Sequence, residues 1–550
     1  MPAHQDPTTR MTAVFLALAG IVGAAVLVVA HVAGAGTRQV HADAPTATAG
    51  HAGPTASATD GTVPAEWVRA ENARPGTRDW QIPLSKVATS DQLTGFSDAA
   101  TARPGATVRL YVSSVSPQVQ VRAYRVGSYG GSHGRLVWSS DPVATTVQPP
   151  AVTDPQTRMV HAPWTPTTSF STTGWPEGLY LLKLTGIGGR ADGLQHYVTL
   201  VLHSATTRGR LAFVSATTTQ TVYNPWGGRS LYGGGAGDDF GERSYVSSMD
   251  RPLDGDGIRK LGQYELGPVW LAESLGLDLA YLASADLERP GILDGARGVV
   301  SLGHDEYWTV AMRHDVEAAR ASGTNVAFLG ANAAYWRIRF EDSPLGPDRV
   351  VVGYKDAGLD PLAARDPQQA TVKFRSEPAA DPENSFTGML YECFPAVGDY
   401  VVTDPTFALF AHTGVQAGTR IPGLIGSEID RAYPIAGTPR TLQVVAHSPA
   451  RCGKSGRTFS DSVYFTSASG AGTFSTGTMA WAIALRGPVK RLGISQQTVD
   501  FTRQVTTNLF EAMAAGPMAR TIVAVPNLAA LHESRSTRTG TGGPVATPSD

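Results

Sequence analysis

The sequence lacks an excess of charge of either sign. Its 550 residues include 45 Lys and Arg against 47 Asp and Glu, for a formal net charge of −2 at pH 7. A nucleic-acid surface or a polybasic membrane patch requires clustered positive charge, so we expect neither, and no nucleic-acid partner. The length is sufficient for two or three domains with a sizeable core.

Cysteine is nearly absent, with Cys393 and Cys452 as the two representatives. Their spacing matches no metal-ligand pattern, which argues against a cysteine-based metal site. Two alternatives stay open for the pair. Outside the cytoplasm the two thiols can form one disulfide that closes a long loop, and otherwise they are two buried free thiols.

Several common catalytic and cofactor motifs are also missing. No strand of the α/β sheet predicted below is followed by a Gly-x-Ser-x-Gly elbow or by a cysteine, which excludes the usual serine and thiol nucleophiles there. No Gly-x-Gly-x-x-Gly fingerprint occurs, so a dinucleotide cofactor is not expected. An active site in this chain must therefore use other chemistry.

An apolar run at residues 11–35 follows a short N-terminal segment that contains Arg10. Residues 1–44 are predicted to be a signal peptide with a small-residue cleavage site near 42–44, or an uncleaved membrane anchor. In either case the rest of the chain is expected to be extracytoplasmic, secreted or tethered by residues 11–35. The Ala/Thr/Gly/Pro-rich residues 45–65 are predicted to be a flexible linker.

Residues 66–206 show short alternating apolar runs separated by Gly/Pro turns, which favours an immunoglobulin-like β-sandwich. No cluster of titratable residues stands out there, so a spacer or binding platform is its expected role. The runs that carry this prediction are residues 108–112, 119–124, 179–184 and 197–202.

Residues 207–520 change to continuous apolar runs that alternate with helical patterns, which predicts a doubly wound α/β domain. Residues 349–478 are harder to interpret and suggest mixed strands and long loops. Residues 521–550, rich in Thr, Gly and Ser, are predicted to be a disordered tail. The predicted strands are 211–216, 277–282, 298–302 and 325–329, and the predicted helices start at Pro268, span 309–322 and close the domain at 499–514.

The strand 298–302 delivers His304 and Glu306 at its carboxyl end, where open α/β sheets bind ligands. An imidazole and a carboxylate two residues apart can bind a metal or move a proton. The alternative is a helix start, with Asp305 or Thr309 as the cap and Glu306 near the positive end of the helix dipole. His314 lies on the following helix, where a histidine is ordinarily a surface residue or has its hydrogen bonds satisfied.

Other polar side chains are expected at the same edge of the sheet. Tyr223 lies in the loop after the first strand, and Tyr264 precedes the Pro268 helix. A bound cation can hold a phenol as phenolate, although Tyr ordinarily titrates near pH 10. Asn332 follows strand 325–329, where it can orient an amide or stabilise an oxyanion, or simply form a turn beside Gly330.

Three motifs occur in order: Tyr-Asn-Pro-Trp-Gly-Gly-Arg-Ser-Leu-Tyr (223–232), Gly-His-Asp-Glu-Tyr-Trp (303–308) and Gly-Ala-Asn-Ala-Ala-Tyr-Trp-Arg (330–337). Together they resemble the catalytic domain of the N,N-dimethylformamidase large (beta) subunit. Gly-Ser-Glu-Ile-Asp (426–430) and Gly-Thr-Met-Ala-Trp (477–481) are weaker matches. The resemblance covers roughly residues 210–514.

The resemblance implies a glutamine amidotransferase/flavodoxin-like α/β layer without its cysteine, and one mononuclear Fe(III). It implies two tyrosines and one glutamate as ligands, and motif by motif these are Tyr223, Tyr264 and Glu306. Hard oxygen donors of this kind suit Fe(III), and three ligands leave a position for water or a carbonyl. The implied catalytic residues are His304 for proton transfer, Asn332 for orienting the amide and Glu428 as a further acid or base.

The sequence therefore predicts an exported metal-dependent hydrolase of non-peptide C–N (amide) bonds. Its partner would be a small-molecule amide or a cell-envelope substrate, and a homo-oligomer is compatible with the sequence. One rival is a catalytically silent cell-surface or carbohydrate-binding module on the same fold. The other is a zinc hydrolase that uses His304, Glu306 and His314.

Overall fold

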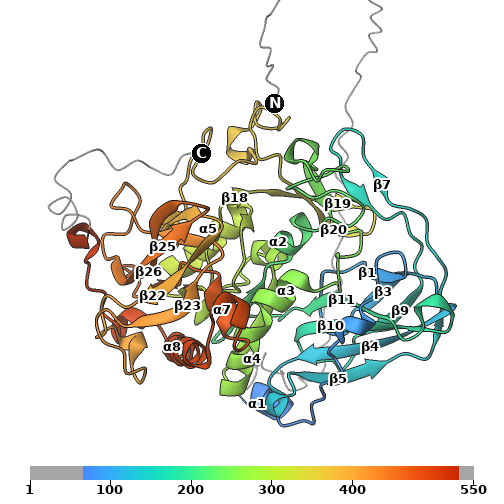
Figure 1. Cartoon of the computed structure of the whole chain (residues 1–550), viewed down its shortest axis with the longest axis horizontal. Helices are drawn as coiled ribbons and strands as arrows, with labels where there is room; N and C mark the ends of the chain where they lie inside the picture. Colours follow the sequence, from blue (N-terminus) through green and yellow to red (C-terminus); the bar gives the residue numbers. More distant parts are fainter. Residues whose placement is uncertain (1–65, 532–550) are drawn as a thin grey trace, which may run out of the picture. The chain divides into compact units, whose positions relative to one another are not determined.

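The computed structural model describes residues 66–531 of the chain (Figure 1). The predicted leader and linker lie outside the described residues, as does the end of the predicted tail. Within the described range, no helix has the length and hydrophobicity that crossing a membrane requires.

Residues 66–206 form β-structure, as the alternating runs predicted, after a short helix α1 (Trp67–Asn72). Two sheets pack face to face through buried aliphatic side chains such as Leu110 of one sheet and Leu182 of the other. The immunoglobulin type of this region stays a prediction. The first sheet has the order β1 (Leu93–Ser97), β3 (Thr107–Ser114), β9 (Thr168–Ser171). The second has the order β2 (Thr101–Ala102), β11 (Gln195–Leu202), β10 (Gly178–Ile187), β4 (Gln118–Val126), β5 (Gly134–Ser139).

A nine-stranded mixed sheet organises the rest of the chain. Its first five strands are parallel, and the four predicted apolar strands are among them. Its last four strands are antiparallel. The parallel part is β14 (Leu279–Ala283), β12 (Leu211–Ser215), β15 (Gly298–Ser301), β17 (Asn325–Phe328) and β27 (Gly472–Ser475). The antiparallel part is β26 (Gly456–Thr466), β25 (Gln443–Cys452), β22 (Ala396–Val401) and β23 (Arg420–Ile425).

The prediction of a doubly wound, flavodoxin-like α/β fold is therefore wrong. Short turns rather than helices join β25 to β26 and β26 to β27, and strands joined by a short turn must run antiparallel. Further strands form small separate sheets, including β13 (Val246–Ser248) with β20 (Gly346–Val352) and β19 (Arg339–Ser343). The residues between the parallel strands β17 and β27 thus build β-structure that extends the sheet.

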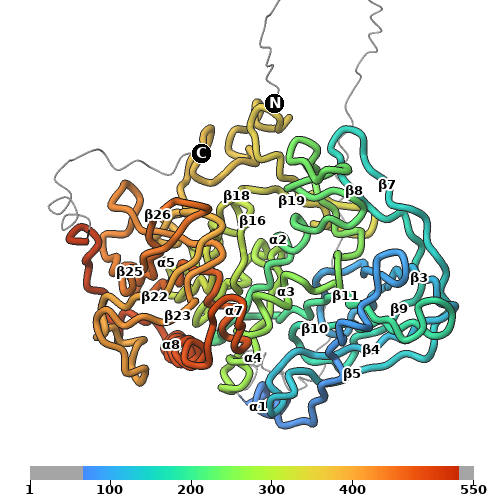
Figure 2. The backbone as a smooth tube through the Cα atoms, in the orientation of Figure 1, coloured from blue at the N-terminus to red at the C-terminus, as the bar shows by residue number. Residues whose placement is uncertain are grey.

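Helices cover both faces of the parallel strands. Along β12, Phe213 packs into a cluster with the helix that carries Phe510, whereas Val214 packs with Met312 on the opposite face. Alternation of side chains along a strand produces this division. The helices are α2 (Thr217–Val222), α3 (Arg259–Tyr264), α4 (Leu266–Leu275), α5 (Val310–Ala321), α6 (Asn384–Thr387), α7 (Ala480–Ala484) and α8 (Gln496–Ala515). Figure 2 traces the same backbone, with α3, α4, α7 and α8 close together.

Two helix ends agree with their sequence signals. The Thr309 side chain accepts a hydrogen bond from the backbone N–H of Met312, so Thr309 is the N-cap of α5. Gly276 follows α4 in the left-handed conformation, with φ of 64°, which glycine adopts without steric cost. Thr309 was one of the two caps expected from the sequence.

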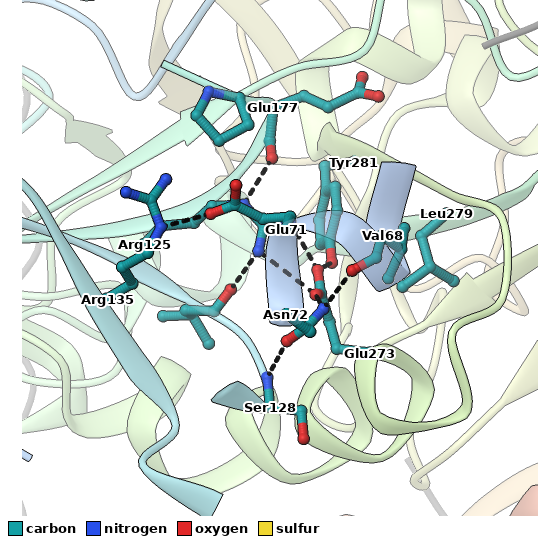
Figure 3. A network of polar contacts seen from close by, with 12 residues as sticks. Val68, Glu71, Asn72, Arg125, Ser128, Arg135, Glu177, Glu273, Leu279 and Tyr281 are labelled. Atoms are coloured by element: carbon teal, nitrogen blue, oxygen red, sulfur yellow. Dashed lines mark hydrogen bonds and ion pairs between the residues drawn. The ribbon is translucent and has the colours of Figure 1, made fainter. Parts of the chain in front are cut away.

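A buried polar network ties the N-terminal β-region to α4 (Figure 3). Arg125 of β4 and Glu273 of α4 are both fully buried, and Arg125 Nη2 lies 2.6 Å from Glu273 Oε1. Asn72 and Tyr281 also donate to the Glu273 carboxylate. Since α4 follows α3 directly, this network also anchors the segment that carries Tyr264.

Cys393 and Cys452 form a disulfide, with Cα atoms 6.1 Å apart and a sequence separation of 59. Of the two alternatives, a disulfide or two buried free thiols, the structure contains the disulfide. Cys393 ends β21 (Leu390–Cys393), which pairs with β24 (Ile429–Arg431). The disulfide thus joins the neighbourhood of Glu428 to the antiparallel half of the large sheet.

Candidate functional site

His304, Asp305 and Glu306 follow β15 and are all buried, with exposed fractions of 3%, 0% and 2%. Gly303 precedes them with φ of +75°, and a Cβ there would lie 2.8 Å from the Cβ of Tyr264. Glycine therefore allows α3 to approach the end of the strand. Thr309 caps α5, as the helix-start alternative allowed, and Glu306 lies buried three residues before that cap.

Two tyrosines hold the carboxylate of Glu306. Tyr223 Oη donates to Glu306 Oε2 at 2.7 Å, and Tyr232 Oη donates to Glu306 Oε1 at 2.6 Å. Tyr307 Oη in turn donates to Tyr232 Oη at 2.7 Å. Burial alone would raise the pKa of Glu306, but hydrogen bonding and charge from His304 and the charge of Lys355 lower it. The carboxylate is thus kept in its charged form.

His304 lies between two carboxylates and one amine. Its Nε2 is 3.3 Å from Glu306 Oε2 and 3.6 Å from Glu428 Oε1. Its Nδ1 is 3.2 Å from Lys260 Nζ. An ammonium group has no acceptor, so a charged Lys260 requires Nδ1 to accept. The proton of a neutral imidazole is then on Nε2, facing the carboxylates.

Asn332 joins this group from the end of the next strand. Its Nδ2 donates to Glu428 Oε2 at 2.9 Å, and its backbone N–H donates to Asp430 Oδ1 at 2.8 Å. Its φ of +61° is left-handed, which agrees with the turn position expected for Asn332. Burial raises the pKa of Glu428 above its usual range, which makes this carboxylate unusually ready to take a proton.

Of the two remaining residues nominated from the sequence, Tyr264 lies near the cluster and His314 does not. The Tyr264 ring centroid lies 5.5 Å from that of His304. Burial and the charge of Glu428 raise the pKa of Tyr264 to about 12. His314 is exposed on α5 and does not join His304 and Glu306.

Four residues of the cluster were not singled out from the sequence: Tyr232, Lys260, Tyr307 and Lys355. Lys260 Nζ lies 3.7 Å from the Tyr223 ring centroid. Lys355 Nζ lies 3.3 Å from the Tyr232 ring centroid, and burial lowers the pKa of Lys355 to about 7. Tyr232 and Tyr307 stand inside the quoted motifs, so the signal for them was present, whereas nothing local marks Lys355.

The donor atoms determine which ion the cluster suits. The described residues contain no group of three or more His, Cys, Asp or Glu side chains that could hold a metal. Phenol and carboxylate oxygens dominate instead, and Asn332 Oδ1 has no hydrogen-bond partner in this part of the chain. Oxygen donors with an anionic carboxylate are compatible in chemistry with a hard cation.

A cavity of about 280 Å³ lies beside α3 and reaches two of the tyrosines. Tyr223 and Tyr264 both line it, so a small molecule in it would contact these two side chains. The polar residues that complete its wall include Gln220, Arg259, Lys260 and Gln263.

Comparison with known proteins agrees with the motifs. No curated protein matches the chain. Residues 120–496, which are more than half of the chain, match the family described as N,N-dimethylformamidase beta subunit-like, C-terminal. The match begins inside β4, so it includes part of the N-terminal β-region as well as the large sheet. The chain therefore belongs to the N,N-dimethylformamidase beta subunit-like C-terminal family.

Proposed function

We propose that this chain is an exported hydrolase of linear amides that uses one mononuclear iron held by Tyr223, Tyr264 and Glu306. The family suggests a dimethylformamidase-like hydrolase. The observation that carries the proposal is the convergence of Glu306, His304 and Glu428 beside a cavity lined by Tyr223. Export rests on the apolar run at residues 11–35.

The proposed ligands fit the ion by chemistry. Tyr223 and Glu306 are already 2.7 Å apart through their oxygens, and Tyr264 faces the adjacent His304 ring. Iron held there would supply Lewis-acid polarisation of an amide carbonyl and a lower pKa for water. The other steps belong to side chains of the chain itself.

Proton movement is assigned to His304 and Glu428. Glu428, whose pKa burial raises, can take a proton from water as the carbonyl carbon is attacked. His304 can give its Nε2 proton to the departing amine, because Lys260 at Nδ1 favours the tautomer with the proton on Nε2. Both groups lie within 4 Å of each other, so the proton has a short path between them.

Asn332 is assigned to orientation of the substrate. Its Nδ2 holds Glu428, while its Oδ1 has no hydrogen-bond partner among the described residues. That oxygen can accept an N–H from an amide. Burial of the cluster keeps bulk water out, which strengthens each of these contacts.

Metal content and the visible spectrum of the full chain, purified in mild detergent, test the proposal. We expect about one iron per chain and a tyrosinate-to-Fe(III) band that weakens in Tyr223→Phe. Tyr111→Phe is the matched control, since Tyr111 stacks on Phe96 in the N-terminal β-region. Amide hydrolysis should fall with the band in Tyr223→Phe and stay unchanged in Tyr111→Phe.

The same measurement separates the rivals. Zinc without colour would replace iron in the proposal. If the chain binds no metal and hydrolyses no amide, the remaining interpretation is a catalytically silent binding module on this fold.

A further inference from the structure

The cavity beside α3 has an unusual charge for a site that would take a neutral amide. Arg259 and Lys260, the first two residues of α3, both line it together with Tyr223 and Tyr264. Its one acidic lining residue is Asp254. The wall next to the two tyrosines is therefore positively charged overall.

Neither cation forms a direct ion pair within the described residues. In residues 66–531, no carboxylate forms an ion pair with the exposed Arg259 or with Lys260, whereas buried arginines such as Arg125 and Arg313 have one. Lys260 contacts the His304 ring nitrogen and the ring faces of Tyr223 and Tyr264, and the charges of Glu306 and Glu428 act on it from further away. Arg259 therefore presents to the cavity a guanidinium without an ion-pair partner among the described residues, and this group can bind an anionic group of a ligand.

The geometry of the cations suits one chemical class of anion. A guanidinium presents parallel N–H groups that match the two oxygens of a carboxylate, and an ammonium adds a point charge. A cavity of about 280 Å³ is at the lower end of small-molecule sites, so the whole ligand must be small. A neutral amide would leave Arg259 without an anionic partner.

We propose that the substrate of this site is a small amide that carries a carboxylate, with the carboxylate bound by Arg259 and Lys260 and the amide carbonyl directed to Tyr223 and Tyr264. N-acyl derivatives of small amino acids have this chemistry. The inference rests on the proposed amide hydrolysis and names the substrate class for it. Hydrolysis adds water across the C–N bond, which gives one carboxylic acid and one amine that keeps the original carboxylate.

Calorimetry with N-acetylglycine and N-acetylglycinamide tests the binding step on the full chain. The two ligands are nearly the same size and differ in the charge of one group. We expect N-acetylglycine to bind more tightly, and Arg259→Gln to weaken its binding at least about tenfold while binding of N-acetylglycinamide is unchanged. The control is Arg365→Gln, because Arg365 is exposed and does not line this cavity. Equal binding of the two ligands, or an equal loss of both in Arg259→Gln, overturns the inference.

Hydrolysis of the same two compounds by the iron-loaded chain separates this inference from the proposed function. We expect Arg259→Gln to raise KM for N-acetylglycine with little change in kcat, since Arg259 binds the carboxylate away from the reacting carbon. If neutral amides are hydrolysed and the charge contrast is absent, the function stands and the inference fails. If neither compound is hydrolysed but the calorimetric contrast is present, the anion site stands and the proposed hydrolysis fails.

Discussion

Tyr232 donates a 2.6 Å hydrogen bond to Oε1 of Glu306. Its ring lies against the Lys355 ammonium, and its own hydroxyl accepts from Tyr307. Oε2 of the same carboxylate faces Tyr223 and His304. One oxygen of Glu306 is thus used to orient the side chain, and the other points to the proposed metal and substrate side.

Tyr232→Phe should therefore weaken the site without removing a proposed ligand. We expect metal affinity and amide hydrolysis to fall by about 10- to 100-fold, because a residue that orients a metal ligand has effects of this size. Metal titration followed by the visible band checks this. Tyr307→Phe is the matched variant, since it removes a bond to Tyr232 and none to Glu306. Equal loss in the two variants would contradict the assignment.

Asn332 allows backbone and side-chain roles to be separated. Asn332→Ala and Asn332→Gly both remove the amide that holds Glu428, and each should lower kcat by about 10²- to 10³-fold. Because φ is +61°, alanine is strained there and glycine is not, so Asn332→Ala should also unfold at a lower temperature than Asn332→Gly. A Gly variant that keeps full kcat would remove Asn332 from the mechanism.

The ion pair between Arg125 and Glu273 should matter for stability. Arg125→Met leaves Glu273 charged and buried without its cation, and we expect a loss of about 3–5 kcal/mol in the free energy of unfolding. The double variant Arg125→Met/Glu273→Leu should recover much of that loss, since no uncompensated charge remains. Denaturant unfolding of the single and double variants measures the coupling, and strictly additive losses would argue against it.

Because His196 is buried, we expect the free energy of unfolding to decrease at acid pH. Burial lowers the pKa of His196 from 6.5 to about 4, so below pH 6.5 the unfolded chain binds a proton that the folded chain does not. Stability should thus be complete above pH 6.5 and fall by about 3 kcal/mol as the pH drops toward 4. His196→Gln should flatten this slope. Part of the slope should remain in this variant, because burial also lowers the pKa values of His133 and His203. A slope that does not change at all in His196→Gln would refute the prediction.

Local patterns predicted the parallel core and much of the site. Continuous apolar runs indicated β12, β15 and β17, and residues at the ends of such strands necessarily meet at one edge of the sheet. His304, Glu306 and Asn332 could therefore be nominated without coordinates. Tyr264 was expected at the same edge from its place before the Pro268 helix, and its ring lies beside that of His304.

The doubly wound fold was wrong because the pattern of residues 349–478 does not say which sheet its strands join. β22, β23, β25 and β26 extend the parallel sheet, and this depends on pairing between segments far apart in the chain. The support of Glu306 by Tyr232 and Lys355 was missed for a related reason. A tyrosine and a lysine in separate loops carry no periodicity that links them.

The sequence by itself determined the apolar strands, the capped helix α5 and the motifs that identify the family, since each depends on neighbours within a few residues. Only the tertiary structure decided which side chains share the Glu306 carboxylate and which strands complete the sheet. Tyr223 and Glu306 are 83 residues apart, and Asn332 and Glu428 are 96 apart. Contacts at such separations come from packing of whole elements, which minimises buried unpaired charge and exposed apolar surface over the entire fold.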